Sequence, residues 1–238
     1  MLIGSNYDKL ELIVGDILLL EPIGFFGDLL IFLISVYFAY KIIKRNVKSS
    51  FFTYWIWFFL IFGTSMLMGG FGHLMYHYWG ESGKYMGWYS SLFATTCLEL
   101  AFISIYPNLA RKKLLTFLAF GKLIAAILLE FYLLSTNDID KNEALGVIIP
   151  SINSFIGLGY CAGYLSYYYQ NKFVVHFHYF WISILILMPA SIFQLLKINP
   201  HQYFDRNDVS HLLLILTLFT FYKGLQKLAV IDLSKSLD

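Results

Sequence analysis

Seven long apolar runs constrain the fold of this chain more than any other feature of its sequence. Each is close to the roughly 20 residues that a helix needs to cross the hydrocarbon core of a bilayer. Of the 238 residues, 58% are hydrophobic and only 13% are charged, which is too apolar for an ordinary soluble domain. We therefore predict an all-α polytopic membrane protein, a single seven-helix bundle over residues 1–238. The predicted spans cover about residues 22–43, 51–79, 85–106, 114–134, 144–169, 173–198 and 208–228.

The N-terminal segment, residues 1–19, precedes these spans and is mildly amphipathic. Its apolar residues at positions 10, 13, 14, 17 and 18 fall on one face of a helical projection. The segment is therefore predicted to be a short interfacial helix that lies on the membrane surface.

Charged residues in the predicted loops alternate in sign along the chain. The loops after the first, third and fifth spans are basic, with Lys44, Arg45 and the run 111–113 among their charges. The N-terminal segment and the loop 135–143 are acidic. By the positive-inside rule, the N-terminus is predicted to lie outside the cell membrane and the C-terminus in the cytoplasm. Since the net charge is only +2 and no basic tract occurs, nucleic acid is not an expected partner.

Two histidines stand four residues apart at the end of the second predicted span. His73 and His77 follow the glycine-rich segment 69–72, and their spacing places both imidazoles on one helical face. The glycines leave room for another helix or a ligand to approach. The predicted orientation brings Asp28 of the first span and His211 of the seventh to the same outer layer. Ionisable side chains at membrane depth mark functional sites by default.

This layer of polar residues predicts a metal site. His73, His77 and His211 are the predicted ligands, because three imidazoles with carboxylates nearby are usual constituents of a zinc site. Zinc would lower the pKa of a bound water to about 7 and so supply a hydroxide nucleophile. Asp208 or Asp28 is predicted to act as a general base or to orient a ligand histidine.

Several of these residues also have a purely structural interpretation. Ser65 lies two turns below His73 and is predicted to hydrogen-bond toward the site, but a serine in such a position often bonds its own helix backbone. Asp208 also fits the N-cap of the seventh helix. His73 and His77 also fit an aromatic belt at the membrane interface, because tyrosines and a tryptophan surround them.

Two short motifs around these histidines resemble those of a seven-helix superfamily. The superfamily's Ser-xxx-His in the second span corresponds here to Gly69-xxx-His73 or to His73-xxx-His77, and its His-xxx-His in the seventh span to Asn207-xxx-His211. On these residues the chain resembles the CREST superfamily, which includes alkaline ceramidases and progestin/adiponectin-type receptors, and it also looks like a bacterial branch with the same topology.

The resemblance implies a fold, a cofactor and an activity. Members of the superfamily are seven-helix proteins that hold zinc with one histidine from the second span and two from the seventh, and they are linked to hydrolysis of lipid amides such as ceramide. The chain departs from the pattern at Lys84 and Trp88, where the superfamily has an aspartate early in the third span. By hypothesis, His77 replaces the histidine that the seventh span lacks.

Three classes of function are consistent with these residues. The leading hypothesis is a membrane-embedded, zinc-dependent hydrolase of a lipid amide or ester, similar to a ceramidase. The alternative is a non-catalytic seven-helix receptor or lipid-binding protein that retains the polar cluster. The third is a transporter or proton channel with a relay of Asp28, Glu99, Glu130 and Lys122, although Glu99 and Lys122 also fit a structural pair. The expected partners are the bilayer and a lipid substrate or ligand, and the glycine patches also fit a homo-oligomer.

Overall fold

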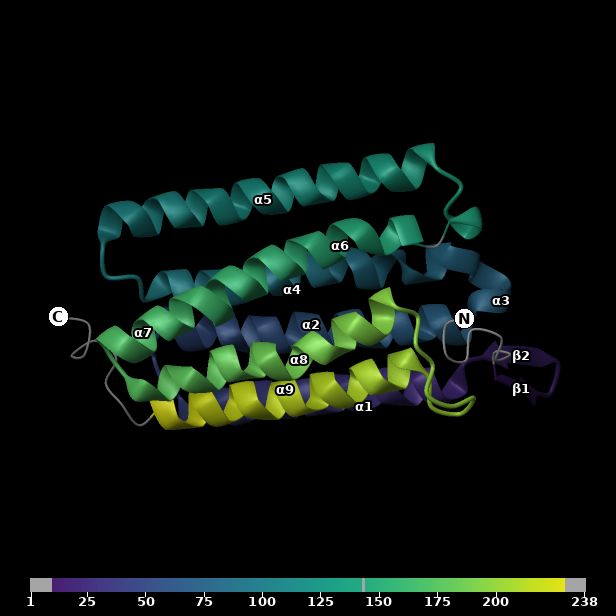
Figure 1. Ribbon diagram of the computed structural model, residues 1–238, viewed down its shortest axis with the longest axis horizontal. Helices are drawn as coiled ribbons and strands as arrows, with labels where there is room; N and C mark the ends of the chain where they lie inside the picture. Colours follow the sequence, from purple (N-terminus) through teal and green to yellow (C-terminus); the bar gives the residue numbers. More distant parts are fainter. Residues whose placement is uncertain (1–9, 143, 230–238) are drawn as a thin grey trace.

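The apolar runs form helices that lie along one common axis (Figure 1). The computed structural model describes residues 10–142 and 144–229. The long rods of the bundle are α1 (Pro22–Arg45), α2 (Ser50–Leu74), α4 (Tyr85–Ser104), α5 (Leu109–Thr136), a rod made of α6 (Ala144–Gly157), the π-helix η3 (Leu158–Leu165) and α7 (Ser166–Lys172), then α8 (His178–Leu195) and α9 (Arg206–Leu228). Short helical turns in the connections are α3 (Tyr76–Trp79), η1 (Gly80–Lys84), η2 (Ile139–Lys141) and η4 (Val175–Phe177).

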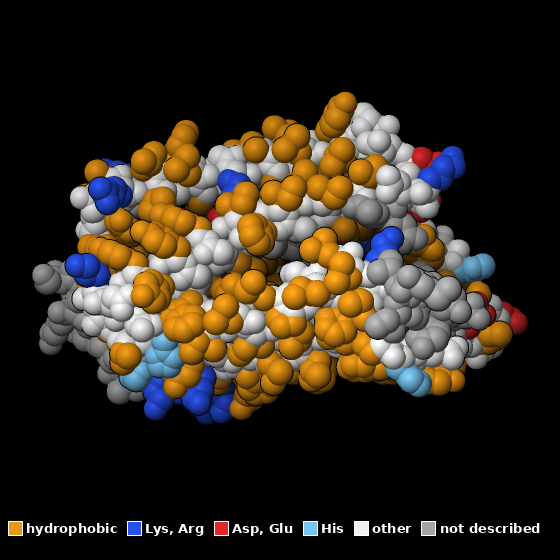
Figure 2. Space-filling view, in the orientation of Figure 1, with side chains coloured by type: hydrophobic (Ala, Val, Ile, Leu, Met, Phe, Trp, Pro, Cys, Tyr) orange, Lys and Arg blue, Asp and Glu red, His pale blue; other side chains and the backbone are white. Residues whose placement is uncertain are grey.

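Six helical segments of the described residues are long and apolar enough to cross a membrane: α1, α2, α5, Leu145–Lys172, Val175–Leu195 and α9. Hydrophobic side chains cover much of the face shown in Figure 2. The chain is therefore an all-α, multi-pass membrane protein, as predicted. α4 is not among the six although it is 20 residues long, because Thr95, Thr96 and Glu99 reduce its apolar character. More than half of its residues are buried inside the bundle.

α1 and α9 run in the same direction, so both begin at one end of the bundle and finish at the other (Figure 1). We name the end with Pro22 and Arg206 the site end, and the end with Arg45 and Leu228 the basic end. Pro22 suits the first turn of α1, because its fixed φ and missing N–H cost nothing there.

Aromatic side chains fill the half of the bundle toward the basic end. Trp55 of α2 is fully buried, with its ring centroid 5.3 Å from that of Phe180 and 5.1 Å from that of Phe221. Phe51 and Phe102 are buried in the same cluster. Contacts of this kind add about 0.5–1.5 kcal/mol per pair to the gain from burial. The cluster therefore fixes α2, α4, α8 and α9 relative to one another.

The segment before α1 is a β-hairpin, so the prediction of an interfacial helix is wrong for residues 10–19. β1 (Glu11–Val14) pairs antiparallel with β2 (Ile17–Leu20) around Gly15, whose φ is 62°. Glycine adopts this φ readily in a two-residue hairpin turn, and the β-branched residues beside it favour strands. Turn chemistry here outweighs the helical periodicity of the apolar residues. Residues 1–9 of that prediction lie outside the described residues.

The second predicted span, 51–79, is not one continuous helix. α2 ends at Leu74, and α3 is a separate turn that follows Met75. η1 then folds the chain back onto α2, where a Cβ on Gly72 would lie only 2.7 Å from the carbonyl oxygen of Gly83. Glycine at this position admits the returning backbone. The break removes the continuous helical face on which the histidine pair was predicted.

α5 lies at one edge of the bundle (Figure 1) and is tied to it by a largely buried lysine. Nζ of Lys122 lies 3.2 Å from Oε1 of Glu99 on α4 and donates to Oδ1 of Asn153 on α6 at 2.6 Å. The predicted pairing of Glu99 with Lys122 is confirmed. Lys122 therefore joins three helices at one point.

Loss of this lysine should destabilise the bundle. Lys122→Met leaves the Glu99 carboxylate buried without its cation, so we expect the free energy of unfolding to fall by about 3–5 kcal/mol. The double variant Lys122→Met/Glu99→Gln should recover most of that loss, because it leaves no buried charge unpaired. Unfolding in detergent micelles, followed by circular dichroism, measures both. Equal losses in the single and double variants would contradict a role for the ion pair.

Candidate functional site

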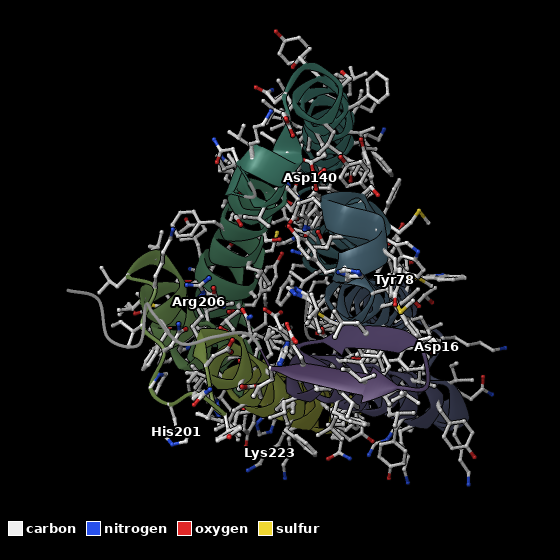
Figure 3. All side chains as sticks on the ribbon, turned by 90° about the vertical axis from the view of Figure 1, so that its right-hand side faces the viewer. Asp16, Tyr78, Asp140, His201, Arg206 and Lys223 are labelled. Carbon is white, nitrogen blue, oxygen red and sulfur yellow. The ribbon has the colours of Figure 1, made fainter. Side chains whose placement is uncertain are left out.

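Two hollows meet at the site end of the bundle. The inner cavity has a volume of about 240 Å³, and the outer vestibule has a volume of about 790 Å³. The inner cavity is lined, among others, by Asp28, Ser65, Gly69, Gly87, Ser91 and His211, and it shares Glu21, Gly24, His73, Trp88 and Asn207 with the vestibule. The shared residues place the two hollows next to each other. Figure 3 looks onto this end, with the vestibule residue Arg206 on the left, Tyr78 on the right and Asp140 above.

His211 of α9 and Asp28 of α1 form the inner pair of this space. Nε2 of His211 lies 3.1 Å from Oδ1 of Asp28, and the two side chains are 12% and 6% exposed. A Cβ on Gly27 would lie 2.3 Å from Nδ1 of His211, and a Cβ on Gly70 would lie 2.8 Å from Cβ of Asp28. The close approach of α1 to α2 and α9 therefore depends on two residues without side chains.

His73 in the last turn of α2 pairs with Glu21, the residue before α1. Nδ1 of His73 lies 2.8 Å from Oε2 of Glu21, and the side chains are 33% and 18% exposed, so this pair is wetter than the inner one. Glu21 has a φ of 49°, a left-handed conformation that costs on the order of 1–3 kcal/mol. Its backbone N–H donates to the carbonyl oxygen of Leu10 at 2.9 Å. The chain beside the hairpin thus helps to hold Glu21, which was not predicted as a site residue.

Two of the three residues predicted to be catalytic line the inner cavity, and the third lines the vestibule. Asp28 lies in the inner cavity. Ser65 lines the same cavity, and its hydroxyl donates to the backbone oxygen of Gly87 at 2.7 Å, so it links α2 to α4 rather than bonding its own helix. Asp208 lines the vestibule, and its Oδ2 accepts from the backbone N–H of Asp205 at 2.9 Å. Asp205, not Asp208, is the N-cap of α9, and the two side chains form a capping box.

The three predicted metal ligands are not brought together. His73 and His211 line one cavity, whereas His77 is exposed on α3, with its ring centroid 5.0 Å from that of Tyr78. Within residues 10–142 and 144–229, no three His, Cys, Asp or Glu side chains form a group that could hold a metal ion. The cavity nevertheless offers two imidazoles and two carboxylates, which are donor types that zinc accepts. A carboxylate would have to take the place of His77.

The vestibule wall carries a further buried ion pair that was not predicted. Nζ of Lys84 lies 2.8 Å from Oε1 of Glu81, and both residues are buried. The backbone N–H of Glu81 donates to Oδ1 of Asp140 at 2.8 Å. The predicted loop between the second and third spans gives no sign of burial, because its burial results from the return of η1 onto Gly72.

Gly27→Ala should separate the inner pair. The new methyl group overlaps the imidazole of His211, so we expect the free energy of unfolding to fall by about 1–3 kcal/mol, the usual cost of overpacking. Gly24→Ala in the same helix is the matched control, since a Cβ there meets no atom within 4 Å. In a His211→Ala background the cost of Gly27→Ala should largely vanish. Denaturant titration in micelles measures the free energy of unfolding of each variant. If Gly27→Ala costs the same in the His211→Ala background as in the native protein, the contact between Gly27 and His211 does not explain the loss.

Comparison with known proteins assigns the chain to a family without naming an activity. Residues 23–230 match the model of a family described as "Family of unknown function (DUF6962)". A search of curated proteins and a search of solved structures each find no match to the chain. Because the matched region covers most of the chain and includes Asp28, His73 and His211, the protein belongs to the DUF6962 family.

Proposed function

We propose that this protein is a membrane-embedded hydrolase of a lipid amide or ester. The observation that carries the proposal is the inner cavity, which is lined by two histidine–carboxylate pairs: His211 with Asp28, and His73 with Glu21. A carboxylate that fixes an imidazole is the arrangement that general-base catalysis uses. The resemblance to the CREST superfamily points to the same class of reaction and stays a prediction, because the family match names no activity.

His73 is the proposed general base. Its Nδ1 bonds Glu21, which leaves Nε2 to take a proton from a water molecule that attacks the carbonyl carbon of the substrate. That proton then passes to the leaving amine or alkoxide as the C–N or C–O bond breaks. Asn207 and Trp88 line both hollows and carry N–H groups, and they are the proposed donors to the carbonyl oxygen as it gains negative charge.

The vestibule fits an amphiphilic substrate. Its wall combines apolar side chains, such as Ile23 and Val147, with polar ones, such as Gln194 and Lys197. An acyl chain is favoured against the apolar part, and a polar headgroup against the rest. The carbonyl group that joins the two parts of such a lipid would then face the inner cavity.

Zinc is the proposed cofactor on the grounds of donor chemistry. With zinc bound, His73 and His211 would be ligands together with Asp28, and the role of general base would pass from His73 to Glu21, which also lines the inner cavity. Bound zinc supplies hydroxide from water near neutral pH. His77 does not belong to this set, because it lies outside the cavity.

We further propose seven membrane spans, with α4 as the third and the site end outside the cell. α4 lies between α2 and α5 along the bundle (Figure 1), so its polar residues face other helices rather than lipid. Lys44, Arg45 and Lys113 belong to the basic end, and the positive-inside rule assigns that end to the cytoplasm. The cavity would then open on the outer side of the membrane.

The two alternative functions make different use of the same residues. A receptor or lipid-binding protein would hold a lipid in the vestibule without turnover. A transporter or proton channel needs polar groups through the full thickness of the membrane, but Glu99, Lys122 and Glu130 line neither hollow. The geometry therefore supports the channel least.

The hydrolase proposal predicts release of fatty acid by the purified protein. With a ceramide and an ester phospholipid presented in mixed micelles, His73→Gln should lower the rate on the preferred lipid by about 100-fold or more, because it removes the base. His77→Gln changes the same residue type outside the cavity and should leave the rate close to native. Mass spectrometry of the released fatty acid measures both. Retention of bound lipid by the native protein with no release would favour the receptor instead.

The zinc proposal predicts a metal content that depends on the cavity histidines and not on His77. Elemental analysis of the purified native protein should find about one zinc per chain, as expected of a single site. His211→Ala should lose it, whereas His77→Ala should retain it. Loss of zinc in both variants would instead restore the ligand set predicted from the sequence. If the native protein contains no zinc but still releases fatty acid, the zinc proposal is wrong and the hydrolase proposal stands.

A further inference from the structure

A separate hollow lies at the basic end of the bundle, between α1 and α9. It is a cavity of about 330 Å³, lined by Tyr37, Lys41, Lys44, Arg45, Tyr222 and Gln226. It shares no wall residue with the two hollows at the site end. Figure 2 shows Lys and Arg side chains gathered toward this end of the molecule. This cavity is therefore a basic site separate from the hollows at the site end.

Three cationic side chains line the cavity and no acidic one does. Nη1 of Arg45 donates to the backbone oxygen of Gln226 on α9 at 3.1 Å, and Nζ of Lys41 lies 5.3 Å from the ring centroid of Tyr37. Neither contact neutralises the charge. Among the described residues, Lys41, Lys44 and Arg45 form no ion pair with a carboxylate.

The helix ends reduce this positive charge without cancelling it. α1 and α9 both finish beside the cavity. Each helix C-terminus carries a partial charge of roughly −0.5. Three positive side chains against two such ends leave a net charge of roughly +2. The cavity thus attracts an anion of one or two charges.

The cavity lies where lipid headgroups are expected. α1 is long and apolar enough to cross a membrane, and its last turns form the cavity wall. Tyr37 and Tyr40 are exposed there, and tyrosines of this kind sit at the interface between membrane and water. Lys and Arg side chains near helix ends likewise extend toward that interface. An anion in this cavity would lie beside the exposed apolar surface of α1, which includes Ile43.

We propose that this cavity binds the phosphate group of an anionic phospholipid. The remaining N–H groups of Arg45 would bond two phosphate oxygens in parallel, and Lys41 and Lys44 would add point charges. The hydroxyls of Tyr37 and Tyr222 supply further donors. The acyl chains would lie along the exposed apolar surface of α1. That surface is why a lipid, rather than free phosphate, is the assigned ligand.

Native mass spectrometry of the whole chain in detergent micelles tests this assignment. Phosphatidylglycerol should bind the native protein about tenfold more tightly than phosphatidylcholine does. The double variant Lys41→Gln/Arg45→Gln should lower the affinity for phosphatidylglycerol by about tenfold or more. The matched control is Lys113→Gln/Lys172→Gln, which removes the same charge from exposed positions at the same end, outside the cavity. This control should bind phosphatidylglycerol as the native protein does.

Two results would overturn the proposal. Equal losses of affinity in the cavity variant and the control would mean that the lipid is attracted by diffuse surface charge. Binding of inorganic phosphate to the native protein, with no preference between the two lipids, would assign the cavity to a free anion.

Circular dichroism checks that the cavity variant keeps its helix content. If the double variant loses helix content, the single variant Lys44→Gln, at an exposed residue, takes its place. It must lower the affinity for phosphatidylglycerol by about threefold or more for the proposal to stand. Neither measurement depends on whether the site end hydrolyses a lipid.

Discussion

Pairing of ionisable side chains inside an apolar bundle is the constraint on which the rest of this structure depends. An isolated charge at membrane depth costs several kcal/mol or more, which favours a partner for each charged side chain. Glu130 of α5 differs, because it is fully buried and neither of its carboxylate oxygens has a hydrogen-bond partner among the described residues. In the described residues, His211–Asp28 joins α9 to α1, and His73–Glu21 joins α2 to the residue before α1. Lys122–Glu99 joins α5 to α4, and Lys84–Glu81 joins the two ends of η1. Three of these pairs lie at the site end, beside the inner cavity and the vestibule. The opposite half is filled by aromatic rings around Trp55.

Glycines decide which of these pairs can form. Asp28 reaches the interior because Gly70 of α2 presents no side chain to it, and His211 reaches Asp28 because Gly27 presents none to the imidazole. Gly72 in turn admits the backbone of η1, which closes the end of α2 and forms part of the vestibule wall. The polar site therefore rests on three glycines, two approached by the side chains of His211 and Asp28 and one by the backbone of Gly83. The glycine-rich segment before His73 therefore helps to form the site that His73 lines.

The sequence predicts the bundle well and the site only in part. Apolar runs with charged ends define the rods, and His73, His211 and Asp28 share a layer because helix direction sets depth. The failures have local causes. A turn glycine converts the N-terminal helix into a hairpin, and the end of α2 at Leu74 removes His77 from the face of His73. The pairing partner of His73 could not be predicted from periodicity, because Glu21 depends on a left-handed backbone conformation before a proline.

The shared direction of α1 and α9 connects the two ends of the molecule. Both helices place their positive N-termini at the site end, where Glu21 and the capping-box residues Asp205 and Asp208 lie. The same two helices place their negative C-termini at the basic end. An anion can be held there only if side-chain cations outweigh both helix ends, and the wall of that cavity supplies three of them. One choice of helix direction therefore places acidic side chains beside two positive helix ends at the site end, and basic side chains beside two negative helix ends at the basic end.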